Sequence, residues 1–127
     1  MVIHESAEDY LESILMIQER YGQVRSIDIV NQLGYSKPSV SIAMKKLRES
    51  GYISMSPDGL ITLNDSGMEI ASSIYNRHKT ITRLFVIMGV SPEQAAEDAC
   101  RVEHVLSQET FERISGFVRE WEEQKKT

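Results

Sequence analysis

The residues with the clearest capacity for chemistry are a cysteine, a glutamate and a histidine near the end of the chain. Cys100, Glu103 and His104 are spaced i, i+3 and i+4, so a helix over residues 92–106 places all three on one face. A thiolate, a carboxylate and an imidazole form a ligand set suited to a first-row transition metal. A different face of this helix carries an apolar packing stripe, made of Ala95, Ala99, Val102 and Leu106. The face with Cys100, Glu103 and His104 is therefore not the face expected to pack in the core.

Three further side chains are candidates to complete such a site. Asp9 and Glu12 are i, i+3 neighbours on a helix predicted over residues 5–20, and His78 lies on a long helix predicted from residue 64 or 65 to about residue 88. Each alone has an ordinary explanation as a solvated helix start or a locally hydrogen-bonded histidine, and a single cysteine usually packs in a core. Together the six residues supply three carboxylates, two imidazoles and one thiol. They suffice for one or two metal sites if the helices converge.

An independent pattern is a basic helix expected over residues 36–50. Ser36 can cap this helix, Pro38 is tolerated in its first turn, and Gly51 supplies the left-handed position after its end. At 100° per residue, one face is apolar and predicted to pack on the core: Val40, Ala43, Met44 and Leu47. Residues 36–48 include four basic side chains and no acidic one.

The outer face of this helix has the properties that reading a DNA major groove requires. Lys45 and Lys46 can neutralise phosphates, small serine hydroxyls permit close approach, and the exposed Ile42 can contact a thymine methyl group. The plainer alternative is a solvated lysine face with one stray isoleucine. The predicted DNA-binding residues are Arg25, Ser36, Lys37, Pro38, Ser39, Ser41, Ile42, Lys45 and Lys46.

The elements around the basic helix predict how it is held. A short helix over residues 27–33, capped by Ser26 and closed by Gly34, comes before it. Two β-rich runs, residues 52–55 and 60–63, follow it and flank a Ser-Pro-Asp-Gly turn. Helix, turn, helix and hairpin in this order are typical of a winged helix-turn-helix, a DNA-binding architecture. The remainder is predicted to be helical, with helix starts at Ser91 and Ser107.

Composition sets limits on the kind of protein. The chain has 127 residues, 41% of them hydrophobic, and no apolar stretch long enough for a membrane span. Residues 1–5 lack the pattern of a signal peptide, and a single cysteine excludes an intrachain disulfide, so a reducing cytoplasm is expected. The formal charge of −5 alone disfavours a nucleic-acid partner. However, residues 22–56 carry five basic and two acidic side chains, so the charge is polarised along the chain.

Four segments of the chain resemble the diphtheria-toxin-repressor and manganese-transport-regulator family of metal-dependent repressors. The matching segments are residues 8–12, 36–51, 77–78 and 97–107, in the family's order. The resemblance implies a mainly α fold, with a winged helix-turn-helix DNA-binding domain over residues 1–63 and a helical metal-binding and dimerisation domain over residues 64–127. It also implies the short architecture, without the small β-barrel domain of the longer iron-responsive members.

Carried over by position, the six candidate ligands fall where the family binds metal: Asp9, Glu12, His78, Cys100, Glu103 and His104. The resemblance is mixed between branches. The manganese branch shares Asp9 and Glu12 but has glutamate at position 100, whereas the iron-responsive branch shares Cys100 but has methionine at position 9. The ancillary site of the iron-responsive branch is only partly kept, since Thr82 and Ala96 replace a glutamate and a histidine.

The expected function is a homodimeric repressor that binds double-stranded operator DNA when loaded with one or two divalent ions per chain. Because thiolate is soft, Cys100 favours Fe(II), Co(II), Ni(II) or Zn(II), and we expect a ferrous-iron or mixed iron and manganese sensor. One alternative is a winged-helix regulator that works without metal. Another is a small metalloenzyme, although no nucleophile or phosphate-binding glycine motif stands out. A metal store would need more ligands than the chain has.

Overall fold

A computed structural model of the chain describes residues 5–126, and it is mainly helical, as the sequence predicts. The described residues form six helices and one two-stranded sheet, and they divide into two compact units, Met1–Ser73 and Ile74–Thr127. Most of the segment that bears on a signal peptide, residues 1–4, lies outside the described residues. Within residues 5–126, no helix has both the length and the apolar character needed to cross a membrane.

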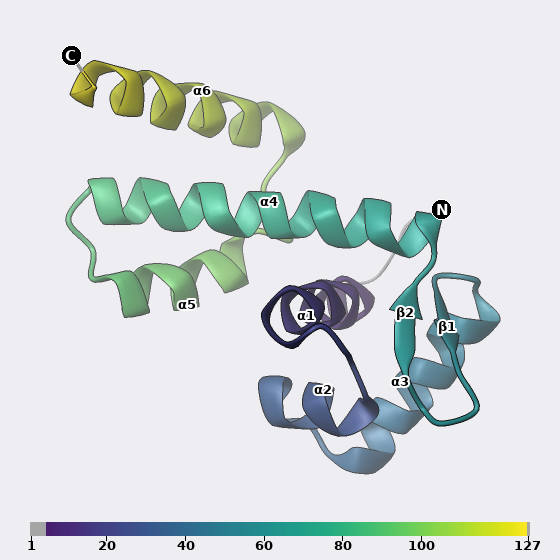
Figure 1. Cartoon of the computed structure of the whole chain (residues 1–127). Coiled ribbons are helices and arrows are strands. Elements are labelled where there is room, and N and C mark those ends of the chain that lie inside the picture. Colours follow the sequence, from purple (N-terminus) through teal and green to yellow (C-terminus); the bar gives the residue numbers. More distant parts are fainter. Residues whose placement is uncertain (1–4, 127) are drawn as a thin grey trace. The chain divides into compact units, whose positions relative to one another are not determined.

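The first unit contains the predicted winged helix-turn-helix. Its elements are α1 (Glu5–Tyr21), α2 (Ser26–Leu33), α3 (Lys37–Glu49), β1 (Ile53–Met55) and β2 (Ile61–Leu63), followed by the beginning of α4 (Asp65–Ile87). Figure 1 shows the α2–α3 helix pair and the hairpin that comes after it. The fold class predicted from the sequence is therefore confirmed for this unit.

The hairpin forms because two short β-prone runs flank a turn that suits them. β1 and β2 pair antiparallel, with Ser54 opposite Thr62 at the centre of the ladder. Gly59 adopts a φ of +88°, a conformation that glycine accepts without steric cost, and its N–H donates to the carbonyl of Ser56 at 2.9 Å. The N–H of Ile61 donates to the carbonyl of Val24 at 2.8 Å, which joins β2 to the segment before α2.

The core of the first unit is made by apolar faces of three helices and the inner side of the hairpin. α1 contributes the largest share, and α3 contributes the apolar face that the sequence predicts. The buried apolar residues of α1, α2, α3 and the hairpin are Tyr10, Leu11, Ile14, Leu15, Ile17, Ile29, Val40, Met44, Leu47, Ile53 and Ile61. This packing fixes which face of α3 turns outward.

The second unit is a helical assembly of the later part of α4 with α5 (Pro92–Val102) and α6 (Gln108–Lys125). Ser91 and Ser107 cap α5 and α6, each accepting a backbone N–H three residues later. One core cluster joins Ile81 of α4, Ala99 of α5 and Phe111 of α6, with Val102 and Leu106 packed against it. The predicted packing stripe is buried at Ala95 and Ala99 and partly buried at Val102 and Leu106, although Leu106 lies beyond the end of α5.

Two predicted helix limits are wrong. α2 begins at Ser26 with Arg25 as its N-cap residue, since the carboxylate of Asp28 accepts the N–H of Arg25 at 2.9 Å. α5 ends at Val102 rather than at residue 106. After Val102 the chain tightens, with the N–H of Val105 donating to the carbonyl of Val102 at 3.1 Å. This turn, residues 103–106, carries Glu103 and His104.

Candidate metal centre and nucleic-acid interface

The most unusual side chain of the second unit is the carboxylate of Glu103. Glu103 is the C-cap residue of α5, and its relative exposure is 0%. Burying a charged carboxylate costs several kcal/mol unless charged or hydrogen-bonding groups surround it. The groups around the Glu103 carboxylate therefore indicate its role.

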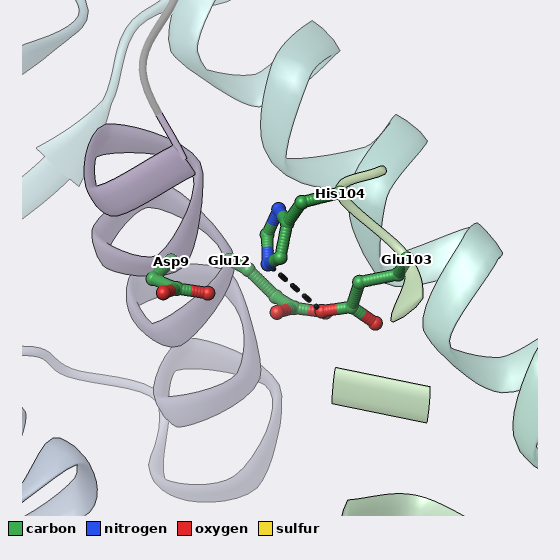
Figure 2. Close-up of side chains that lie close together, drawn as sticks. All are labelled: Asp9, Glu12, Glu103 and His104. Atoms are coloured by element: carbon green, nitrogen blue, oxygen red, sulfur yellow. Dashed lines mark ion pairs between the residues drawn. The ribbon is translucent and has the colours of Figure 1, made fainter. Parts of the chain in front are cut away.

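Each oxygen of this carboxylate faces an imidazole. Nδ1 of His78, on α4, lies 2.9 Å from Oε2 of Glu103, and Nε2 of His104 lies 3.4 Å from Oε1. The His104 side chain is 1% exposed and that of His78 is 17% exposed. Figure 2 marks the approach of His104 to Glu103 with a dashed line. The structure thus brings three of the six predicted ligands together within one unit.

Arg77 of α4 holds the turn that carries these groups. Its Nη1 donates to the carbonyl of Glu103 at 3.0 Å and to that of Leu106 at 2.8 Å, and its Nη2 donates to Oε1 of Gln108 at 3.0 Å. Its guanidinium also lies over the Phe111 ring, 5.0 Å from the centroid. Sequence reasoning did not single out Arg77, and the only signal available was its place beside His78 in a family-like segment.

In the first unit, α1 presents the predicted carboxylate pair. Asp9 is partly exposed and Glu12 is buried, although both come from the same helix, as Figure 2 shows. Tyr10, between them in sequence, packs edge-on against Tyr35 with ring centroids 5.8 Å apart. Burial is the main cause that raises the pKa of Tyr10 above its usual value, and electrostatic repulsion from Tyr35 and Asp9 adds to it. A buried acidic side chain on an otherwise apolar helix face is uncommon unless it has a specific role.

Cys100 differs from the other candidates on α5. Its side chain is exposed, whereas Glu103, one turn later, is fully buried. The predicted helix over residues 92–106 is too long, because α5 ends at Val102; Glu103, its C-cap residue, keeps helical backbone angles and donates its N–H to the carbonyl of Ala99 at 2.9 Å. The two residues of the ancillary positions, Thr82 and Ala96, are both partly buried.

The chemistry of the residues present fits a divalent transition metal. Carboxylate oxygens suit Mn(II), imidazole nitrogens suit Fe(II) and Zn(II), and Glu103 with its two histidines offers both types in a buried setting. Metal-binding carboxylates and imidazoles are commonly held by partners in an outer shell, a role that His78 and Arg77 can fill at Glu103.

The predicted DNA-binding face of α3 is a polar surface with one apolar residue at its centre. Val40, Met44 and Leu47 are buried and Ala43 is partly buried, while Ile42 is 58% exposed. Ser36 caps the helix, accepting the N–H of Ser39 at 3.2 Å, and its hydroxyl donates to Oγ of Ser39 at 2.8 Å. All nine predicted DNA-binding residues are exposed: Arg25, Ser36, Lys37, Pro38, Ser39, Ser41, Ile42, Lys45 and Lys46.

Arg25 has an additional contact that the sequence does not reveal. Its Nη1 donates to the carbonyl of Asp58 in the turn of the hairpin, and its Nη2 lies 3.9 Å from the Asp58 carboxylate. The hydroxyl of Ser56, a backbone N–H and the charge of Arg25 lower the pKa of Asp58, in decreasing order of effect. Arg25 therefore links the start of α2 to the hairpin turn.

The fold defines a winged-helix DNA-binding unit followed by a helical unit with a buried carboxylate and imidazole cluster. Two family models cover nearly the whole chain. Residues 3–60 match the N-terminal DNA-binding domain of iron-dependent repressors, and residues 64–126 match their metal-binding and dimerisation domain. The chain belongs to the iron-dependent repressor family.

Individual relatives agree with this membership. An uncharacterized HTH-type transcriptional regulator of Methanocaldococcus jannaschii is 35% identical over 94% of this chain and 97% of its own length. The transcriptional regulator MntR of Salmonella typhimurium is 34% identical over 91% of this chain and 74% of its own length. A solved manganese-dependent transcriptional repressor in complex with manganese superposes with a TM-score of 0.81 at 28% identity, covering 88% of this chain. This chain spans about half of that structure's chain, 52% of it.

Proposed function

We propose that this protein is a metal-dependent transcriptional repressor that binds operator DNA as a homodimer when loaded with a divalent transition metal. The observation that carries the proposal is Glu103, a fully buried carboxylate with an imidazole nitrogen facing each oxygen. Family membership supports it, because residues 3–60 match a DNA-binding domain and residues 64–126, which include this cluster, match a metal-binding and dimerisation domain.

The proposed ligands are the six that the sequence singles out: Asp9, Glu12, His78, Cys100, Glu103 and His104. Glu103 and His104 form the part of the set with the most buried side chains, and Glu12 is the buried carboxylate of α1. A divalent ion would supply positive charge that offsets the repulsion among these carboxylates. His78, in contact with Glu103, orients that carboxylate whether or not it also binds an ion itself.

The regulatory step follows from where these ligands stand in the chain. Asp9 and Glu12 belong to the DNA-binding unit, and Glu103 and His104 belong to the helical unit. Ligands from both units that share an ion restrict the arrangements the units can adopt. Metal can favour the DNA-binding state only by binding it more tightly than the other states, and a hundredfold preference corresponds to about 2.7 kcal/mol per site.

On the DNA side, the outer face of α3 is the proposed reader of the major groove. Lys45 and Lys46 contact phosphates, the serine hydroxyls allow close approach, and Ile42 packs on a thymine methyl group. Two copies related by a two-fold axis would contact half-sites about one helical turn, or a multiple of it, apart. The proposed physiological metals are Fe(II) and Mn(II), with Cys100 as the ligand that favours iron.

The test is an anaerobic DNA-binding titration with one metal at a time. A duplex selected from a random pool in the presence of Mn(II) serves as probe, and binding is measured with Mn(II), Fe(II), Co(II), Zn(II) or a chelator. We expect Glu103→Gln to weaken metal-dependent binding by at least about 100-fold while the protein stays folded, because ligand loss exceeds the usual effect of an outer-shell change.

The matched control is Glu97→Gln, because Glu97 is an exposed carboxylate on α5 whose Oε1 lies 3.4 Å from Nη2 of the exposed Arg101. It should bind DNA like the parent protein. Binding that persists unchanged in chelator would instead identify a metal-independent winged-helix regulator. Metal-dependent turnover of a substrate without any DNA binding would identify an enzyme.

A further inference from the structure

One side chain of α4, Arg77, bonds three acceptors in or next to the turn after α5. Its guanidinium bonds two backbone carbonyls, of Glu103 and Leu106, and the side chain of Gln108, all within 3.0 Å. The same group lies over the ring of Phe111 at 5.0 Å from its centroid. One side chain of α4 thus spans the turn from its first residue to the start of α6.

The carbonyls that Arg77 bonds belong to the turn after α5, since Glu103 is the C-cap residue of α5 and Leu106 comes directly before Ser107, the N-cap residue of α6. A cation is favoured at the C-terminal end of a helix, where the carbonyl ends of the peptide dipoles lie. A guanidinium presents several donors in a fixed plane, so it can bond two carbonyls from one nitrogen and a third acceptor from the other. Arg77 therefore adds bonds from α4 to a turn whose own backbone bonds run from the N–H groups of Val105 and Leu106 to the carbonyl of Val102.

The neighbouring residue acts on the same target by a different route. Arg77 holds the backbone of Glu103, and His78 approaches its carboxylate with Nδ1 at 2.9 Å from Oε2. Two successive residues of α4 thus fix both the main chain and the side chain of Glu103. His104 follows Glu103 directly, so its position depends on the same turn.

We propose that Arg77 is the positioning residue of the metal centre: it holds the 103–106 turn in the conformation that presents Glu103 and His104 to a divalent cation. This inference rests on the proposed function, since it needs the cluster to bind metal. Arg77 does not itself contact the ion, because a guanidinium carries only donors. Its contribution is preorganisation, which spares the ligands the ordering that binding would otherwise require.

The experiment compares Mn(II) binding in three variants of the full chain, read by the electron paramagnetic resonance signal of unbound Mn(II). We expect Arg77→Gln to weaken Mn(II) binding by about tenfold or more, within the 10–100-fold range of outer-shell residues. Arg77→Lys, which keeps the charge but not the planar donors, should recover only part of the affinity. Arg83→Gln is the matched control, because Arg83 lies on the same helix and contacts Glu122 and Trp121 rather than the turn.

A second readout separates positioning from a general loss of stability. Hydrogen exchange in the metal-free protein should accelerate at the amides of residues 103–108 in Arg77→Gln, with the amides of α1 to α3 unchanged. Mn(II) affinity equal to the parent protein in Arg77→Gln would overturn the positioning role while leaving the proposed function intact. Absence of Mn(II) binding in the parent protein itself would overturn the proposed function and, with it, this inference. A global rise in exchange together with weaker binding would also overturn it, since it marks a structural role.

Discussion

Cys100 and Glu103 lie about one helical turn apart, yet the structure gives them opposite environments. The sequence predicts both as candidate ligands, because their spacing puts them on one face of a helix. In the structure the thiol is exposed and the carboxylate is fully buried. Groups distant in the sequence surround Glu103, since His78 of α4 faces its carboxylate and Arg77 bonds its backbone carbonyl. Local pattern predicted the residue types of the site, and tertiary contacts decided which are buried.

At the residue scale, Cys100 should govern which metal is preferred. We expect Cys100→Glu to raise the preference for Mn(II) over Zn(II) by about tenfold or more, because it exchanges a soft thiolate for a hard carboxylate. The measurement is a competition titration between the two ions under anaerobic conditions. Cys100→Ser, which removes the thiolate without adding a carboxylate, controls for loss of the sulfur alone. An unchanged ratio in both variants would exclude Cys100 from the ligand set.

At the scale of elements, the winged helix-turn-helix was predictable because its signals are local. The cap at Ser36 and the buried face of α3 hold in the structure, and so does the hairpin around the Ser-Pro-Asp-Gly turn, which Figure 1 shows as β1 and β2. The contact between Arg25 and the turn residue Asp58 was not predictable, since it joins residues that no periodic pattern relates. The predicted DNA-binding residues are thus exposed as expected, and one of them, Arg25, also donates to the carbonyl of Asp58 in the hairpin turn.

The outer face of α3 gives a prediction about salt. Lys45→Ala should weaken binding to all DNA sequences and reduce the slope of log affinity against log salt by about one, because one fewer counterion is released. Filter binding or anisotropy over a range of salt concentrations measures this slope. Lys126→Ala removes an exposed lysine beyond α6 and should leave the slope unchanged. An unaltered slope for Lys45→Ala would show that this residue does not contact phosphate.

The start of α4 gives a prediction about stability. A Cβ at Gly67 would lie 2.2 Å from the carbonyl oxygen of Tyr52, so Gly67→Ala forces the helix and the wing apart. We expect a loss of about 1–3 kcal/mol in the free energy of unfolding, the usual cost of overpacking. Gly116→Ala in α6 meets nothing within 4 Å and should instead add up to about 1 kcal/mol through helix propensity. Urea denaturation of both variants checks the opposite signs.

At the scale of the whole molecule, the charge explains why composition alone is a poor guide to partners. The sum of −5 disfavours nucleic acid, but residues 22–56, which include α2, α3 and β1, carry five basic and two acidic side chains. Part of the acidity belongs to the proposed ligands Asp9, Glu12 and Glu103. Divalent ions would offset this part of the charge, so metal loading and DNA affinity share an electrostatic origin.

Metal should also stabilise the folded protein as a whole. Because an ion that binds only the native state shifts unfolding by mass action, Mn(II) at about one hundred times its dissociation constant should add about 2.7 kcal/mol. Thermal unfolding should therefore move upward with Mn(II) and return on chelation. In Glu103→Gln the shift should vanish at the same Mn(II) concentration. An equal shift in that variant would place the stabilising ion elsewhere.

The bond from the N–H of Ile61 to the carbonyl of Val24 makes one proton a reporter of how the first unit opens. The bond joins positions on either side of α2, α3 and β1, so it forms only after the intervening chain has closed a long loop. Its exchange with solvent needs the wing to part from the helices, an event far rarer than fraying of a helix end. Exchange of that single amide thus measures how often β2 separates from the segment before α2.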